Sequence, residues 1–108
     1  MPHDPHLADL MRSALQRRRG FSEKKMFGGY CWMFEGNMVC GVEVGRYMFR
    51  VGKALEPLAL ARPGAAPMAF TGKKMGGFVW VDADAALDAG LDSWVDLAMQ
   101  FVGGLPPK

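Results

Sequence analysis

The chain begins with a spacing of apolar residues that is typical of an amphipathic helix. The stripe is flanked by Asp4-Pro5, a helix start signal, and by Gly20, which tolerates the left-handed backbone that often ends a helix. Three arginines, Arg17-Arg18-Arg19, precede this glycine and complement the negative end of a helix dipole. The pattern therefore predicts a first helix. Its apolar residues recur at intervals of three and four: Leu7, Leu10, Met11, Ala14 and Leu15.

From Tyr30 onward the pattern changes to the alternation of a β-strand. The run Tyr30–Phe34 is followed by the turn Glu35-Gly36-Asn37 and by a second apolar run, Met38–Val44. After the short turn Gly45-Arg46, a third run, Tyr47–Val51, again alternates. Three strands joined by tight turns predict an antiparallel meander.

The middle of the chain is less regular. Residues 52–62 predict a short helix, which Pro57 permits only if it lies in the first turn. Two prolines and a glycine mark residues 62–67 as a loop. We predict an edge strand at Met68–Thr71 and a final strand at Gly76–Val81.

The last segment predicts a closing helix. Aspartates lie at its entry, where negative charge complements the helix dipole, and Gly103-Gly104 ends it. Residues 83–89 form a separate turn in this interpretation, because Gly90 weakens one continuous helix. The apolar stripe of the helix consists of Leu91, Trp94, Val95, Ala98, Met99 and Val102.

The order of these elements predicts an α+β fold in two layers. It runs as a helix, a three-stranded antiparallel meander, a short helix, two strands and a C-terminal helix, with helices covering one face of the sheet. At 108 residues the chain has the size of one compact domain. We therefore expect a single domain over residues 1–108, with an ordered core at about residues 5–102.

Composition and charge restrict the function classes. A net charge of +2 and a pI near 8.7 fall short of the balance, above about 9, that dedicated nucleic-acid binders show. Cys31 and Cys40 lie inside apolar runs without metal or redox spacing, which predicts reduced, buried thiols. The chain shows neither a leader pattern nor an apolar stretch of the ~20 residues that a membrane span needs. We expect a cytoplasmic protein.

Residues with catalytic or metal-binding chemistry are sparse. His3 and His6 have helical spacing for a metal pair, but no third histidine completes a set, and they are better explained as terminal residues. None of Ser13, Ser22 and Ser93 has a nucleophile-elbow context. We therefore expect no enzymatic activity, no cofactor and no metal. Six methionines, which suit a soft metal but more often fill core gaps, are Met26, Met33, Met38, Met48, Met68 and Met75.

Two surfaces are candidates for binding. Basic residues predict a nucleic-acid patch, with a solvated rim as the plainer explanation, while aromatic strand residues in excess of one core face predict a partner surface or a homodimer interface. The predicted basic patch contains Arg17, Arg18, Arg19, Lys24, Lys25, Lys73 and Lys74. The predicted partner surface contains Tyr30, Trp32, Tyr47, Phe78 and Trp80.

One motif occurs twice in different order. Lys24-Lys25-Met26-Phe27-Gly28-Gly29-Tyr30 opens the first strand run, and Lys73-Lys74-Met75-Gly76-Gly77-Phe78 opens the last. Glycine pairs next to lysines suit a phosphate cradle, but neither copy matches a phosphate-loop motif. We interpret Met26, Phe27, Gly28 and Gly29 as a structural motif in which glycine allows close backbone packing.

Taken in order, these elements resemble the TfoX/Sxy N-terminal domain family over roughly Leu7 to Val102. The resemblance rests on the Lys25–Tyr30 motif, the Glu35-Gly36-Asn37-Met38 turn, the strand Tyr47–Val51, Gly72–Met75 and Trp94. It implies a helix, an antiparallel sheet and further helices in two layers. The family's name comes from a regulator of natural competence in which a second, helical domain follows, and we expect this chain to be a stand-alone member without that domain.

The resemblance therefore implies a stand-alone, non-enzymatic domain for regulation or protein interaction, with a role connected to transcription. Two alternatives stay open. One is a weak nucleic-acid binder that uses the lysine and arginine patch, and the other is a small enzyme or ligand carrier without a recognisable motif.

Overall fold

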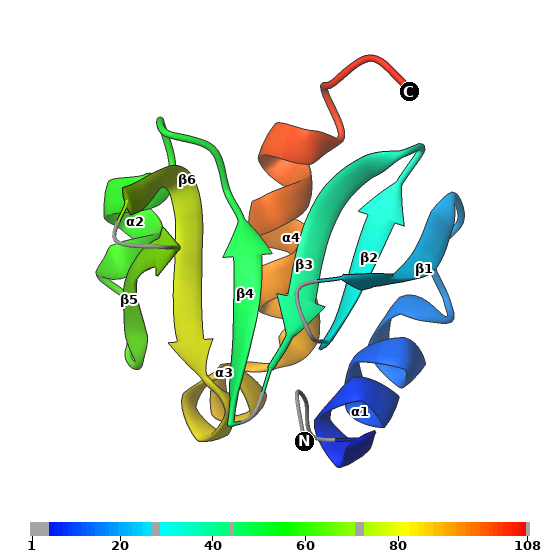
Figure 1. Cartoon of the computed structure of the whole chain (residues 1–108), viewed down its shortest axis with the longest axis horizontal. Coiled ribbons are helices and arrows are strands. Elements are labelled where there is room, and N and C mark those ends of the chain that lie inside the picture. The colour runs from blue at the N-terminus through cyan, green and yellow to red at the C-terminus, as the bar shows by residue number, and fades with distance from the viewer. Residues whose placement is uncertain (1–4, 27–28, 44, 71–72, 108) are drawn as a thin grey trace.

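The computed structural model describes residues 5–26, 29–43, 45–70 and 73–107 (Figure 1). These residues form helices and strands in the order expected for an α+β protein. The elements are α1 (Pro5–Leu15), β1 (Phe21–Met26), β2 (Gly29–Phe34), β3 (Asn37–Val42), β4 (Arg46–Arg50), α2 (Glu56–Leu60), β5 (Ala65–Phe70), β6 (Lys73–Asp82), α3 (Ala83–Ala89) and α4 (Leu91–Val102).

The strands form one antiparallel sheet in the order β1-β2-β3-β4-β6-β5. The helices lie on one side of it, with α4 packed behind β3 and β4 (Figure 1). This arrangement confirms the predicted two-layer α+β fold. None of the helices among the described residues is long and apolar enough to cross a membrane.

The sequence pattern missed one strand. Phe21–Met26 forms β1, which pairs with β2 from Phe21 opposite Phe34 to Met26 opposite Gly29, so the meander has four strands instead of three. β1 lies at the edge of the sheet, where charged side chains prevent pairing with another chain. Because Glu23, Lys24 and Lys25 are all charged, the sequence of β1 lacks the alternation of apolar and polar residues that identifies a strand.

Local residue types account for three further boundaries of the fold. β5 begins at Ala65, inside the predicted loop, because an edge strand tolerates Pro67. α2 carries Pro57 in its first turn, as the prediction required. Gly90, with a φ of 95°, separates α3 from α4, so residues 83–89 form a helix of their own.

Most residues of the predicted helical stripes are buried, and Leu10, Ala14 and Met99 are partly buried. Trp94 is 0% exposed, and its ring stacks on Phe49 with centroids 5.1 Å apart and an interplanar angle of 17°. The hydroxyl group of Tyr47, another buried residue, donates a hydrogen bond of 2.7 Å to the carbonyl oxygen of Leu7. These contacts attach α1 and α4 to the centre of the sheet.

Candidate functional site

The side of the sheet without helices is the first candidate for a binding surface. We call it the helix-free face. Strand register places Cys31, Gly41, Met48 and Trp80 side by side on it, and its apolar residues form a cluster separate from the helix-covered core. The side chains of this cluster are Cys31, Met38, Met48, Met68, Phe78 and Trp80.

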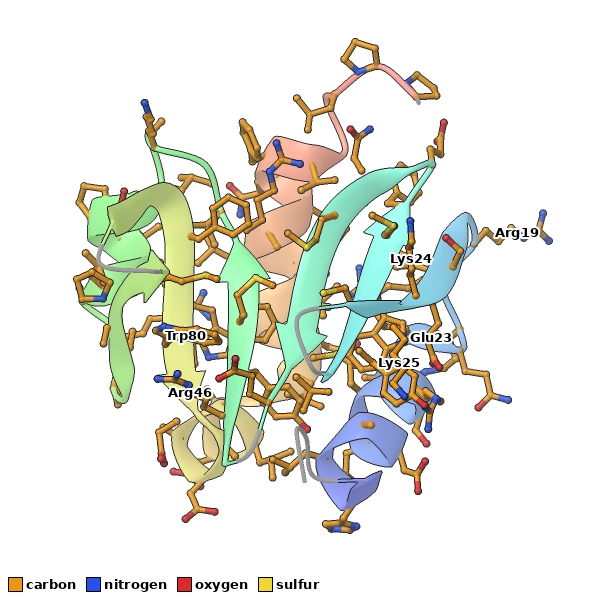
Figure 2. The ribbon with its side chains drawn as sticks, viewed as in Figure 1. Arg19, Glu23, Lys24, Lys25, Arg46 and Trp80 are labelled. Atoms are coloured by element: carbon orange, nitrogen blue, oxygen red, sulfur yellow. The ribbon has the colours of Figure 1, made fainter. Side chains whose placement is uncertain are left out.

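Two arginines of β4 cover aromatic rings on this face. The guanidinium carbon of Arg46 lies 3.8 Å from the centre of the Trp80 ring, and Nε of Arg46 donates a 3.0 Å hydrogen bond to Glu43. Figure 2 shows Arg46 in front of Trp80. The guanidinium carbon of Arg50 lies 5.7 Å from the centre of the Phe78 ring. Such cation–π contacts favour a cation over the ring face.

The result is a surface of mixed character. Met48 is only 3% exposed and Met68 only 4%, so the thioethers fill the layer beneath the rings. Among the described residues, the large hydrophobic side chains that are clearly exposed are Leu58 and Leu87, both on helices. The helix-free face therefore presents half-buried aromatic rings and arginines to solvent, and its most apolar groups are sealed.

The predicted partner surface is divided by the fold. Trp32 and Tyr47 are 3% and 0% exposed in the helix-covered core, so their assignment to a partner surface is corrected. Tyr30 packs against the same core beneath Arg12, whose guanidinium carbon is 5.1 Å from the ring centre. Strand alternation sends these three side chains to the side that the helices cover. Only Phe78 and Trp80 come together on the helix-free face.

The predicted basic patch is also dispersed. β1, which carries Lys24 and Lys25, is separated from β6, which carries Lys73 and Lys74, by three strands. The side chains of Lys73 and Lys74 lie outside the described residues. In Figure 2, Lys24 lies on the helix-free side and Lys25 on the side of α1, while Arg19 points away from the sheet. The fold does not bring these cations into one continuous surface.

Two arginines of this set connect helices instead. Arg18 Nη2 lies 2.6 Å from Asp96 and 3.4 Å from Asp92, and Arg17 Nη2 lies 3.1 Å from Asp92. These ion pairs join the turn after α1 to α4. Arg17 and Arg18 are therefore already paired with carboxylates that compete with any phosphate.

The glycine pair of the second motif copy, Gly76-Gly77, packs closely against neighbouring residues. Gly77 has a φ of 84°, and its carbonyl oxygen accepts hydrogen bonds of 2.8 and 3.0 Å from the amides of Val51 and Gly52. The amide of Gly77 donates to Oε1 of Glu56 at 3.0 Å. The second glycine pair thus serves close backbone packing, and its Gly77 amide is occupied by the protein itself. Phe27 and Gly28 of the first copy lie outside the described residues.

Both thiols are buried and free, as predicted. Burial raises the pKa of Cys31 to about 11. The pKa of Cys40 is also raised, by burial first and then by the charge of Cys31. Because the thiolate is the reactive form, neither side chain suits nucleophilic chemistry at neutral pH. The described residues contain no group of three or more histidine, cysteine, aspartate and glutamate side chains placed to hold a metal.

A polar groove of about 590 Å³ separates α1 from β1. Within it, Arg12 donates to both carboxylate oxygens of Glu23 at 2.6 and 3.0 Å and to Asp9 at 2.7 Å. Trp32 Nε1 donates to Glu23 at 3.1 Å. The hydrogen bonds from Arg12 lower the pKa of Glu23, followed by the charge of Arg12 and the Trp32 bond, while burial opposes them. This network ties α1 to β1, and we interpret it as structural.

Glu23→Gln tests that interpretation through pH. A carboxylate with a lowered folded pKa stabilises the native state above its unfolded value of about 4.3 and loses that effect as pH falls through the folded pKa. At pH 7 the variant is expected to be less stable by under about 1 kcal/mol, since the pair is partly exposed. The deficit measured by urea unfolding should shrink as pH falls from 7 through the lowered folded pKa of Glu23. Asp88→Asn, which changes an exposed carboxylate on α3, is the control; a deficit for Glu23→Gln that is independent of pH would contradict the network.

Of the comparisons with known proteins, the comparison with protein families gives a match. The sequence pattern of the family described as the TfoX N-terminal domain matches residues 13–102 of the 108. Neither the curated proteins nor the solved structures contain a match to the chain.

Proposed function

Since the chain belongs to the TfoX N-terminal domain family, we propose that it is a non-enzymatic regulatory domain that binds an acidic protein partner on its helix-free face. The observation that carries the proposal is the pairing of Arg46 with Trp80 and of Arg50 with Phe78 on that face. Arginine and large aromatic residues are enriched at the energetic centres of protein interfaces.

The charge of the face supports an acidic partner. Lys24 and Arg50 form no ion pair with any residue that the structure describes, and Arg46 forms one with Glu43 alone. A second copy of this chain brings the same cations, so self-association through this face places like charges together. A partner segment with carboxylates between apolar residues complements both the guanidinium groups and the rings.

The two open strand edges suit a partner less well. β1 carries consecutive charged residues, and β5 carries Pro67, which lacks a backbone donor. Both features hinder the pairing of a partner's strand with the edge of the sheet. The face is therefore our proposed route of recognition.

The regulatory and cytoplasmic parts of the proposal have separate support. The TfoX regulator from which the family takes its name acts in natural competence, and we propose a comparable regulatory role through protein contact. Free thiols at Cys31 and Cys40 favour a reducing compartment. The raised thiol pKa values favour a binding role over nucleophilic catalysis.

Charge reversal at Arg46 tests the proposal. Immobilised protein is incubated with an extract of the native host, and retained proteins are compared between the parent, Arg46→Glu and Arg19→Glu. Arg46→Glu is expected to lose a specific acidic partner by roughly tenfold or more, because it removes an interface arginine and repels carboxylates. Both arginines are exposed, so neither change disturbs the core.

Arg19→Glu is the matched control, because it makes the same change of charge away from the face (Figure 2). Equal loss in both variants means that total charge, not this surface, governs binding, and contradicts the proposal. Sedimentation of the purified protein gives a second readout. A stable homodimer that Arg46→Glu dissociates would replace the acidic partner with a second copy of the chain.

A further inference from the structure

A second hollow, of about 430 Å³, opens where the ends of β4 and β6 approach the C-terminal end of α4. Among the described residues, its wall contains two cations, two phenyl rings and several glycines, and no acidic side chain. The side chains and backbone that matter for recognition belong to Arg50, Lys53, Gly76, Gly77, Phe78 and Phe101.

Arg50 lies between the two rings. Its guanidinium carbon is 5.7 Å from the centre of Phe78 and 5.4 Å from the centre of Phe101. A guanidinium group that packs its flat face on aromatic rings keeps the N–H donors at its edge available for a bidentate anion. Other arginines of the fold use these donors on carboxylates, as Arg12 does on Glu23. Among the described residues, Arg50 has no carboxylate within ion-pair distance.

Lys53 places a second positive charge at the rim. A side chain on Gly76 would come within 2.9 Å of Lys53 Cε, so the lysine stem lies directly against the bare backbone of that glycine. A side chain on Gly52 would come within 2.6 Å of the Phe101 ring. The glycines therefore let a cation and a ring close over the backbone. The described wall of the hollow therefore carries two cations beside apolar rings, while the carboxylate of Glu56 lies against the amide of Gly77.

Three backbone amides beside the hollow already have hydrogen-bond partners within the protein. The amides of Val51 and Gly52 donate to the carbonyl oxygen of Gly77, and the Gly77 amide donates to Glu56. Phosphate loops depend on free amides that point at the ligand. The recognition groups here are instead a planar guanidinium, an ammonium group and two rings, which suit a planar carboxylate.

We propose that this hollow is a binding site for a small aromatic carboxylate of one or two rings. The carboxylate pairs with the edge of Arg50 and with Lys53, and the aromatic body packs against Phe78 and Phe101. The volume lies at the lower end of the range for small-molecule sites, about 300 to 1,000 Å³, which limits the size of the ligand. The hollow shares Arg50 and Phe78 with the proposed protein-binding face, but Arg46 lies outside it, so variants of Arg46 and of the hollow test the two proposals separately.

NMR titration of the ¹⁵N-labelled protein with 2-naphthoate tests the site. Saturable shifts are expected for the amides of Gly52, Gly76, Gly77 and Phe101. The neutral isostere 2-naphthamide should bind at least about tenfold more weakly, because it lacks the charge that the cations recognise. Arg50→Met should weaken 2-naphthoate binding by about tenfold or more, and Lys53→Met by a smaller factor.

Arg46→Met is the matched control, because it also removes an arginine stacked on an aromatic ring but lies outside the hollow. It should leave the affinity for 2-naphthoate unchanged. Arg50→Lys keeps the charge and loses the planar fork, so it should fall between the parent and Arg50→Met. The proposal is overturned if shifts do not saturate, if 2-naphthamide binds as tightly, if Arg46→Met weakens binding equally, or if inorganic phosphate competes at similar concentration.

Discussion

Replacing Trp94 with alanine is expected to lower the free energy of unfolding by about 3 to 5 kcal/mol. The indole ring is fully buried and stacks on Phe49 between α4 and the sheet. Its Nε1 has no hydrogen-bond acceptor among the described residues, so the loss arises from packing and from the cavity left behind, not from a broken hydrogen bond. Urea unfolding followed by circular dichroism measures the change.

Trp94→Phe and Leu58→Ala calibrate this result. Phenylalanine keeps a ring against Phe49 and should recover a large part of the lost stability. Leu58 is 56% exposed on α2, and its truncation should change stability by less than about 0.5 kcal/mol. A loss below about 1 kcal/mol for Trp94→Ala would mean that α4 does not depend on this anchor.

Gly77→Ala is expected to destabilise the protein by about 2 to 5 kcal/mol. The residue has a φ of 84°, which costs an L-residue about 1 to 2 kcal/mol. The new methyl group would also lie 3.1 Å from the backbone of Gly52, which cannot rotate aside as a side chain does. The hydrogen bonds that Val51 and Gly52 donate to Gly77 depend on this close approach.

Gly45→Ala separates the two contributions to this loss. Gly45 has a similar φ of 75°, but a methyl group there meets nothing within 4 Å. We expect it to lose only the conformational part, about 1 to 2 kcal/mol. Equal losses at both positions, measured by urea unfolding, would show that crowding at Gly52 is unimportant and that the second glycine pair is not a packing device.

Both predictions concern how the binding surfaces are held. Trp94 supports β4 from the helix-covered side, while Arg46 and Arg50 project from the same strand to the other side. Gly77 joins the end of β4 to β6 beside the hollow of Arg50. Rigid strands position side chains more accurately than loops do, so the arginine and aromatic pairs have a firm base.

Much of the architecture was predictable because the spacing of apolar residues within each element indicates whether it is a helix or a strand. The spacing of Leu91, Trp94 and Val95 in α4 identified the buried side of that helix, and the positions of Pro57 and Gly90 set the limits of neighbouring helices. β1 was not predictable in this way. Its charged residues are compatible with a strand only because the strand lies at the sheet edge, and edge position depends on the rest of the fold.

The candidate sites were less predictable than the fold. The strands contain more aromatic residues than one core face needs, which indicated a partner surface. Alternation alone does not tell which side of the sheet the helices cover, and Trp32 and Tyr47 proved to be core residues. Arg46 and Arg50 were missed, although the alternation of Tyr47–Val51 places Arg50 on the side of the strand opposite Tyr47 and Phe49. The stacking of these arginines on Trp80 and Phe78 requires the pairing of β4 with β6, and α2 and β5 separate these two strands in the chain.

By itself, the sequence determined the family, the order of the elements other than β1 and the apolar side of each long helix, because these depend on residue type and spacing over short distances. The tertiary structure alone decided which side of the sheet is covered, and it placed three strands between the lysines of β1 and those of β6. It also brought Arg50 of β4 to Phe101 of α4. Strand order and helix packing create these contacts between distant segments, and local patterns carry no record of them.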